Sequence, residues 1–167
     1  MKMRLAFGLL ITLFGFGRVV SAQNGPITCF IQTYNGHYLT AVGGGGRIDD
    51  VIHSDATQGQ SWEKFTLVDS GLGTSTITYG IKTKTGNYLT AVDGGGLTQD
   101  VIHSDATQIR DWEQFQLFAL GNGYYSIRTY TGNYLTAVGG GGRITDVIHS
   151  DATKVSSWET FKLTCGV

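Results

Sequence analysis

The segment GHYLTAVGGGGRIDDVIHSDATQGQSWEKFTL, residues 36–67, recurs twice along the chain. The two further copies are GNYLTAVDGGGLTQDVIHSDATQIRDWEQFQL at 86–117 and GNYLTAVGGGGRITDVIHSDATKVSSWETFKL at 132–163. They align without gaps, and 21 of the 32 columns are identical in all three copies. Differences in length fall in the linkers 68–85 and 118–131. Such self-similarity predicts one small structural unit that is repeated three times and packs against its own copies.

Each copy carries the signals of short β-strands and no helical period. In the first copy, we expect strands at 29–34, 38–42, 51–54 and 63–68, separated by glycine-rich turns. Four strands in each of three repeats make twelve, which predicts an all-β fold, a β-trefoil with threefold internal repeat. Propeller blades are similar in length, but three blades fall below the usual minimum of about four.

The first 22 residues have the pattern of a secretory signal peptide rather than of a buried core helix. A basic start at Lys2 and Arg4 precedes an apolar run at 5–17, which is too short to span a bilayer, and a small-residue cleavage site at 20–22. Residues 23–167 are then expected to form a single β-trefoil domain, with repeats at about 27–76, 77–122 and 123–165. We expect the product to be secreted, extracellular or periplasmic, without membrane insertion.

The charge balance narrows the choice of partners. Residues 23–167 carry 9 basic and 13 acidic residues, a net charge of −4. This balance provides no basic surface and argues against a nucleic-acid partner. We expect a monomer that needs neither cofactor nor metal.

The two cysteines fit a closed barrel. Cys29 lies on the first expected strand and Cys165 just after the last, and these strands are neighbours when a threefold barrel closes. In an oxidising compartment we expect a disulfide between them. The chain-entropy model gives a loop of 136 residues a stabilisation of about 4 to 5 kcal/mol as an upper figure. Two reduced, buried thiols are the alternative.

Strand alternation predicts where the tryptophans point. If Phe65 and Leu67 face the core, Trp62 faces solvent, because side chains alternate along a strand. A sugar can lay its C–H face on an exposed indole and direct its hydroxyls to a neighbouring carboxylate. Alternatively, the indole caps the barrel edge and the glutamate satisfies backbone amides. The candidate ligand-binding pairs are Trp62 with Glu63, Trp112 with Glu113, and Trp158 with Glu159.

The His-Ser-Asp run of each repeat supplies further candidates, because its first and third residues share one face of a strand. These residues either contact a ligand or organise the loop that leads to the tryptophan. A structural zinc site is disfavoured because each copy offers two ligands and zinc takes four. Three adjacent residues on a strand also cannot form a Ser-His-Asp catalytic triad. The candidates are His53, Asp55, His103, Asp105, His149 and Asp151.

Taken together, the GNYLTAV-GGG, V-I-H-S-D-A-T and W-E-x-F-x-L motifs resemble the fascin-like β-trefoil superfamily, and most closely carbohydrate-binding module family 92. The resemblance covers residues 29–165 and implies one site in each repeat, where the Trp-Glu pair binds β-1,6- or β-1,3-linked glucan. A weaker similarity links the V-I-H-S-D run to mussel galactose-binding trefoil lectins. Those lectins carry an H-P-x-G-G motif, and this chain has Thr40, Thr90 and Thr136 at the position of its histidine.

The sequence therefore predicts a secreted, non-catalytic carbohydrate-binding protein with three equivalent sites for a polysaccharide or other glycan, most of all β-glucan. A galactose-binding lectin is one alternative, and a protein-interaction or inhibitor trefoil acting through the linker 69–76 is another. A glycoside hydrolase would need two carboxylates about 5 to 10 Å apart around one bond. Because the sites come in threes, it would need three such catalytic centres in one small fold, which we do not expect.

Overall fold

The computed structural model describes residues 25–72 and 76–167, so the expected signal peptide lies outside the described residues. Within these ranges the chain forms twelve strands and five short 3-10 turns. The strands are β1 (Ile27–Gln32), β2 (Tyr38–Ala41), β3 (Ile52–Ala56), β4 (Lys64–Asp69), β5 (Tyr79–Lys82), β6 (Tyr88–Ala91), β7 (Ile102–Ala106), β8 (Gln116–Gly121), β9 (Tyr124–Arg128), β10 (Tyr134–Ala137), β11 (Ile148–Ala152) and β12 (Phe161–Cys165).

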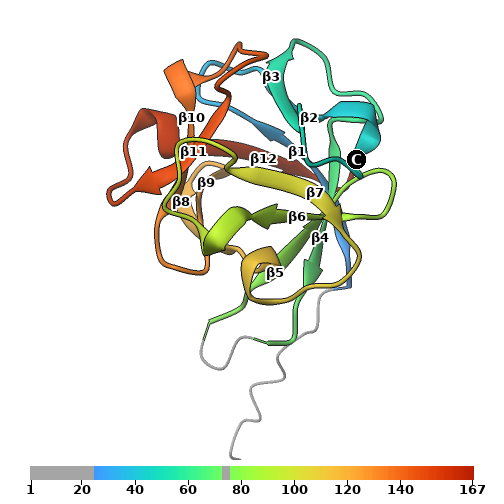
Figure 1. Cartoon of the computed structure of the whole chain (residues 1–167). Coiled ribbons are helices and arrows are strands. Elements are labelled where there is room, and N and C mark those ends of the chain that lie inside the picture. Colours follow the sequence, from blue (N-terminus) through green and yellow to red (C-terminus); the bar gives the residue numbers. More distant parts are fainter. Residues whose placement is uncertain (1–24, 73–75) are drawn as a thin grey trace, which may run out of the picture.

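Six of these strands close into a barrel. Antiparallel pairing joins β4 to β1 and β5, β9 to β8 and β12, and β12 to β1. A bridge between Tyr79 and Phe115 completes the circle between β5 and β8. The other strands form the hairpins β2–β3, β6–β7 and β10–β11, which lie at three positions around the molecule (Figure 1). The predicted all-β trefoil with twelve strands is confirmed.

The core repeats with the sequence. Phe65, Phe115 and Phe161 are fully buried, and each lies at or beside the start of the last strand of its repeat. In β4 the buried positions alternate with partly exposed ones, as the apolar pattern predicts. In the described ranges 25–72 and 76–167, no helix is long and apolar enough to cross a membrane.

The expected disulfide is present. Cys29 of β1 and Cys165 of β12 are direct register partners, and their sulfur atoms are bonded. The first and last strands of the barrel are therefore joined by backbone hydrogen bonds and by a covalent link. Both cysteines are accounted for, and neither remains as a thiol.

Neighbouring repeats meet at a glycine turn that leaves no room for a side chain. Gly45, Gly95 and Gly141 adopt φ values of +107°, +111° and +106°. A Cβ atom at these glycines would lie 2.1 to 2.2 Å from the hydroxyl oxygen of a threonine of the next repeat. Both the backbone conformation and the close approach therefore require glycine. The threonines are Thr83, Thr129 and Thr33, so the contact runs around the whole molecule.

A buried serine locks the same junction. Ser54, Ser104 and Ser150 are fully buried on β3, β7 and β11. Their hydroxyls accept backbone N–H bonds of 3.1 to 3.2 Å from the glycine-rich loop of the preceding repeat. The backbone atoms of each serine pair with that loop as well. The middle residue of the His-Ser-Asp run is therefore a structural residue that joins two repeats.

This junction predicts a large effect of one methyl group. We expect Gly45→Ala to lower the free energy of unfolding by at least about 2 kcal/mol, because the new Cβ meets Thr83 at 2.2 Å. Urea denaturation of the purified variant measures the loss.

Gly36→Ala is the matched control, because Gly36 also has a positive φ, +85°, but has no neighbouring atom within 4 Å of the new Cβ. Gly36→Ala should lower the free energy of unfolding by only about 1 kcal/mol, the cost of holding an alanine in the left-handed backbone conformation. Equal losses in the two variants would contradict the steric account of the junction.

Candidate functional site

The three tryptophans are the most prominent exposed aromatic residues that the repeats share. Trp62, Trp112 and Trp158 retain 47%, 44% and 46% exposure. They do not lie on strands as the alternation argument assumed. Trp62 lies in the turn before β4, and the other two lie in the 3-10 turns η3 (Asp111–Glu113) and η5 (Ser157–Glu159). The expected exposure is nevertheless what the structure has.

The glutamate after each tryptophan points inward. Glu63, Glu113 and Glu159 are only 6 to 7% exposed. One carboxylate oxygen of Glu63 accepts a 2.8 Å hydrogen bond from the Thr40 hydroxyl, and the other accepts one of 2.8 Å from the Gln60 backbone N–H. Glu113 accepts the equivalent bonds from the Thr90 hydroxyl and the Arg110 backbone N–H. Glu159 accepts them from the Thr136 hydroxyl and the Ser156 backbone N–H. Each carboxylate thus holds the tryptophan turn against the second strand of its repeat.

Hydrogen bonding determines the charge state of one of these groups. Burial acts to raise the pKa of the Glu159 carboxyl, but hydrogen bonds from Ser156 and Thr136 outweigh it and hold the pKa below its ordinary value. The Ser156 hydroxyl adds a third contact of 2.5 Å to the same carboxylate. Glu159 therefore remains ionised at neutral pH despite its burial.

Indole and carboxylate share a surface depression in the first repeat. Trp62 and Glu63 line a hollow of about 390 Å³ together with Gln60, Ser61 and residues 56–58. In the second repeat, Glu113, Asp105 and Arg110 line a hollow of about 320 Å³ at the corresponding place, and Trp112 is not among its lining residues. We call the surface around Trp62, Trp112 and Trp158 the first, second and third clefts.

Each cleft is completed by the next repeat. A Cβ placed on Gly44 would lie 3.4 Å from Trp62 Cδ1 and 3.4 Å from Thr85 Cγ2. The Thr85 backbone N–H donates a 3.0 Å bond to the Gly44 carbonyl. The Thr131 N–H donates the same 3.0 Å bond to the Gly94 carbonyl, and the Asn35 N–H donates it to the Gly140 carbonyl. In the first and second clefts, the tryptophan and the turn of the following repeat therefore approach the same buried glycine.

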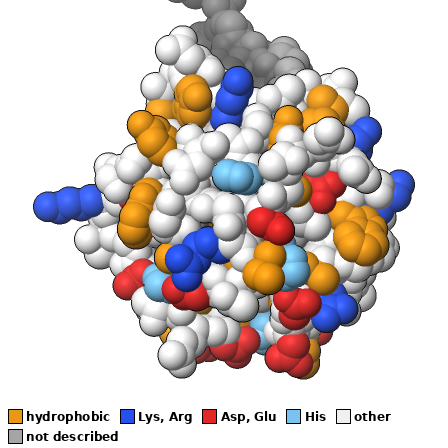
Figure 2. All heavy atoms as spheres, turned by 90° about the horizontal axis from the view of Figure 1, so that it is seen from above, with side chains coloured by type: hydrophobic (Ala, Val, Ile, Leu, Met, Phe, Trp, Pro, Cys, Tyr) orange, Lys and Arg blue, Asp and Glu red, His pale blue; other side chains and the backbone are white. Residues whose placement is uncertain are grey.

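The histidines pair with an aspartate that the His-Ser-Asp interpretation did not single out. His53 and Asp55 do lie on the same face of β3, as expected. The His53 imidazole, however, bonds Asp50 at 2.7 Å, and His103 and His149 bond Asp100 and Asp146 at 2.7 and 2.6 Å. Figure 2 shows such neighbouring histidine and acidic side chains on one face of the molecule. The Asp50, Asp100 and Asp146 backbones adopt positive φ values.

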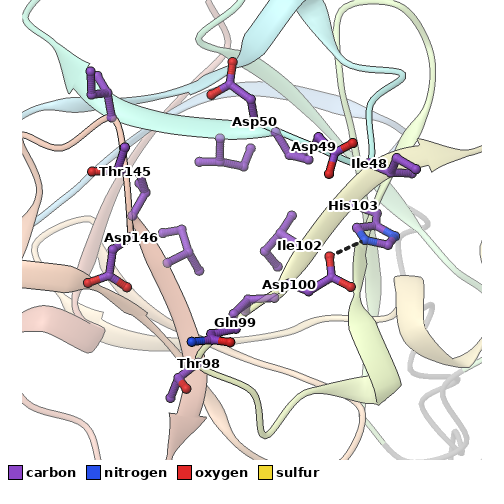
Figure 3. A pocket seen from close by; sticks show the side chains of 16 residues that line it. Ile48, Asp49, Asp50, Thr98, Gln99, Asp100, Ile102, His103, Thr145 and Asp146 are labelled. Carbon is purple, nitrogen blue, oxygen red and sulfur yellow. Dashed lines mark hydrogen bonds and ion pairs between the residues drawn. The ribbon is translucent and has the colours of Figure 1, made fainter.

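Among the candidates, Asp105 shares a hollow with Glu113, whereas His103 lies elsewhere, at the rim of a different depression. That larger depression, of about 930 Å³, is formed by the segments 48–52, 98–103 and 144–148 of the three repeats. Its buried surface is aliphatic and comes from the paired Val and Ile residues of each repeat, and acidic side chains surround it (Figure 3). In the part of the chain that the structure describes, no three His, Cys, Asp or Glu residues are placed to hold a metal ion.

Comparison with known proteins shows the fold. No family model matches the chain, and neither does any curated protein. The designed threefold-symmetric protein ThreeFoil matches with a TM-score of 0.67 at 17% identity, covering 84% of this chain and 99% of that one. SeviL, solved bound to asialo-GM1 saccharide, matches with 0.61 at 14% identity, covering 84% and 98%.

An exo-β-1,3-galactanase from Clostridium thermocellum matches with 0.64 at 18% identity; the match covers 86% of this chain but 30% of that one. At these identities the similarity shows that the chain has a β-trefoil fold, which it shares with the designed protein, with SeviL and with a part of the galactanase.

The lowered pKa of Glu159 predicts a loss of stability at acid pH. As pH falls below about 4.5, the ordinary value for glutamate, the unfolded chain binds a proton at residue 159 before the folded protein does. The contribution of Glu159 to the stability of the folded protein is therefore present above that pH, and it is lost as pH falls through the lowered pKa. Urea denaturation between pH 6 and pH 3 should show a shallower decline for Glu159→Gln than for the unaltered protein. An identical pH dependence would contradict the assignment of this carboxylate.

Proposed function

We propose that the protein is a secreted, non-catalytic carbohydrate-binding protein whose three clefts each bind a segment of glycan, β-1,6- or β-1,3-linked glucan in particular. One observation carries the proposal. Each repeat presents a half-exposed indole directly followed by a carboxylate that the fold has buried and fixed in place. The choice of β-glucan rests on the resemblance to carbohydrate-binding module family 92.

The chemistry of the first cleft suits a sugar ring. An indole left half in solvent is available to the C–H face of a pyranose, which gains from burial against an aromatic surface. Glu63 accepts one hydrogen bond at each oxygen within the protein. A carboxylate has about four acceptor positions, so it keeps capacity for a sugar hydroxyl. Because Thr40 and Gln60 already hold it, the group loses little freedom on binding.

The larger depression between the repeats is a weaker candidate for a sugar. The residues that line it include aliphatic and acidic side chains and His103 but no Trp, Tyr or Phe. A sugar there would lack the aromatic platform that the clefts provide. This is why we assign glycan binding to the clefts although they are smaller.

The state of Glu159 supports binding rather than hydrolysis. A glycoside hydrolase needs one carboxyl group whose pKa is raised so that it can donate a proton. Burial does act to raise the pKa of Glu159, but the hydrogen bonds from Ser156 and Thr136 outweigh it and hold the pKa below its ordinary value. Three clefts on one small domain also suit a polysaccharide, because the second and third contacts become local events that raise avidity by about 10²- to 10⁴-fold where geometry allows.

A galactose-binding lectin is the second candidate. It is favoured by the V-I-H-S-D run and by Asp105, which lines the hollow of the second cleft. In that case either His53, His103 and His149 or Asp55, Asp105 and Asp151 would bind the sugar, because His103 and Asp105 line different depressions. The disulfide between Cys29 and Cys165 suits an oxidising compartment and so supports secretion under either candidate.

Native affinity electrophoresis of residues 23–167 tests both candidates. The protein runs through gels that contain β-1,6-glucan, β-1,3-glucan or a galactan, beside a gel without polysaccharide. We expect retardation by a β-glucan, its relief by free glucose oligomers, and its loss in the triple variant Trp62→Ala, Trp112→Ala and Trp158→Ala.

The triple variant His53→Ala, His103→Ala and His149→Ala is the matched comparison, because it also alters one residue in each repeat but none that lines the hollow of a cleft. It should keep the retardation. Retardation by galactan alone, abolished in the histidine variant, would establish the second candidate. Retention that persists in the tryptophan variant would contradict the assignment of the clefts.

A further inference from the structure

The turn that completes each cleft carries a different exposed side chain. Residues 33–36, 83–86 and 129–132 form equivalent turns, each closed by a backbone bond from the glycine N–H to the threonine carbonyl of 2.9 to 3.0 Å. The second residue of the turn is Tyr34, Lys84 or Tyr130. All three side chains are exposed, the two tyrosines by 57% and 56%. Their rings therefore contribute little to the core.

In the second cleft the tyrosine stands next to the tryptophan. Tyr130 Cδ1 lies 3.5 Å, and Trp112 Cδ1 3.4 Å, from one and the same point, the place of a Cβ on Gly94. The two rings come from different repeats and border the same glycine. Both are about half exposed, so together they present two aromatic surfaces to solvent in one cleft.

Equivalent backbone bonds give the other clefts the same framework. The residue after each exposed side chain donates its N–H to the glycine carbonyl at 3.0 Å in all three junctions. Gly44, Gly94 and Gly140 have nearly the same φ, +84°, +80° and +81°. Tyr34 occupies the turn position in the third junction that Tyr130 occupies in the second, and there the atoms nearest to a Cβ on Gly140 belong to Asn35. The first cleft has Lys84 at this place.

We propose that the three clefts are not equivalent: the second and third bind two consecutive sugar residues, one on the tryptophan and one on the tyrosine of the next repeat, and the first binds one. This inference rests on the proposed function and names what selects ligand length at those sites. A tyrosine supplies a rigid amphipathic surface on which a second pyranose can lie, with a hydroxyl at its rim. A lysine is a flexible point charge and supplies no such surface.

The residues that distinguish the clefts lie outside the repeated columns. The 21 identical columns suggest identical sites, but each cleft takes part of its wall from outside its own 32-residue copy. Tyr34, Lys84 and Tyr130 all precede the first column of the next copy. The selection of ligand length therefore resides in the residues between the copies.

Three double variants isolate the clefts, since each leaves one tryptophan. They are Trp112→Ala with Trp158→Ala for the first cleft, Trp62→Ala with Trp158→Ala for the second, and Trp62→Ala with Trp112→Ala for the third. Each is titrated calorimetrically with glucose and with β-1,6- and β-1,3-linked glucose di-, tri- and tetrasaccharides. We expect the second and third clefts to bind the disaccharide about three- to tenfold more tightly than glucose, the gain of one added aromatic contact. The first cleft should show no such gain.

Exchange of the turn residue then decides the cause. Tyr130→Ala in the second-cleft variant should abolish the gain, and Lys84→Tyr in the first-cleft variant should create it. Both positions are exposed, and the remaining tryptophan reports a folded cleft by its binding of glucose oligomers.

The outcomes separate the two proposals. Sugar binding with the same length dependence in all three clefts, or an unchanged gain in Tyr130→Ala, overturns the inference and leaves the proposed function standing. Failure of every variant and of the unaltered protein to bind any of the sugars overturns both.

Discussion

The structure depends on the contact between a glycine turn of one repeat and a threonine of the next. Gly45, Gly95 and Gly141 have positive φ values and no room for a Cβ against Thr83, Thr129 and Thr33. The buried serines Ser54, Ser104 and Ser150 add hydrogen bonds at the same junctions. Each contact joins two successive repeats, and the last repeat joins the first. A single repeat therefore lacks the threonine against which its glycine turn packs. The threefold arrangement is thus a requirement of the local packing.

The clefts are consequences of this junction. The glycine next to the threonine contact, Gly44 in the first repeat, supports the indole on one side and the following turn on the other. Glu63 secures the tryptophan turn from within through Thr40 and Gln60. The exposed residue of the next turn can vary, because the backbone bond of the junction comes from the residue that follows it. The junction contacts are therefore repeated in all three copies, while the exposed residue beside each cleft differs.

The sequence predicted the fold well because its signals were local and present in triplicate. The twelve strands and the disulfide between Cys29 and Cys165 follow from alternation, turns and closure. The tryptophans are exposed as expected, but they lie in turns rather than on strands. The same alternation places Glu63 in phase with Phe65 and Leu67, so its burial was a signal present in the sequence. The bond from the Gln60 N–H agrees with the alternative in which the glutamate satisfies backbone amides. The His53–Asp50 bond depends on a positive φ at Asp50, which strand periodicity does not reveal. The approach of Tyr130 to Trp112 depends on tertiary packing between repeats, which no pattern within one repeat contains.

The central claim is that the tryptophans are the ligand platforms, and the chain offers a direct test because it has three tryptophans in all. In a ¹H–¹⁵N correlation spectrum each indole N–H gives one resolved signal, so each cleft has its own reporter. Titration with a β-linked glucose tetrasaccharide should shift all three indole signals in a saturable manner. Indole signals that stay in place while backbone amides around His53, His103 and His149 shift would contradict the account.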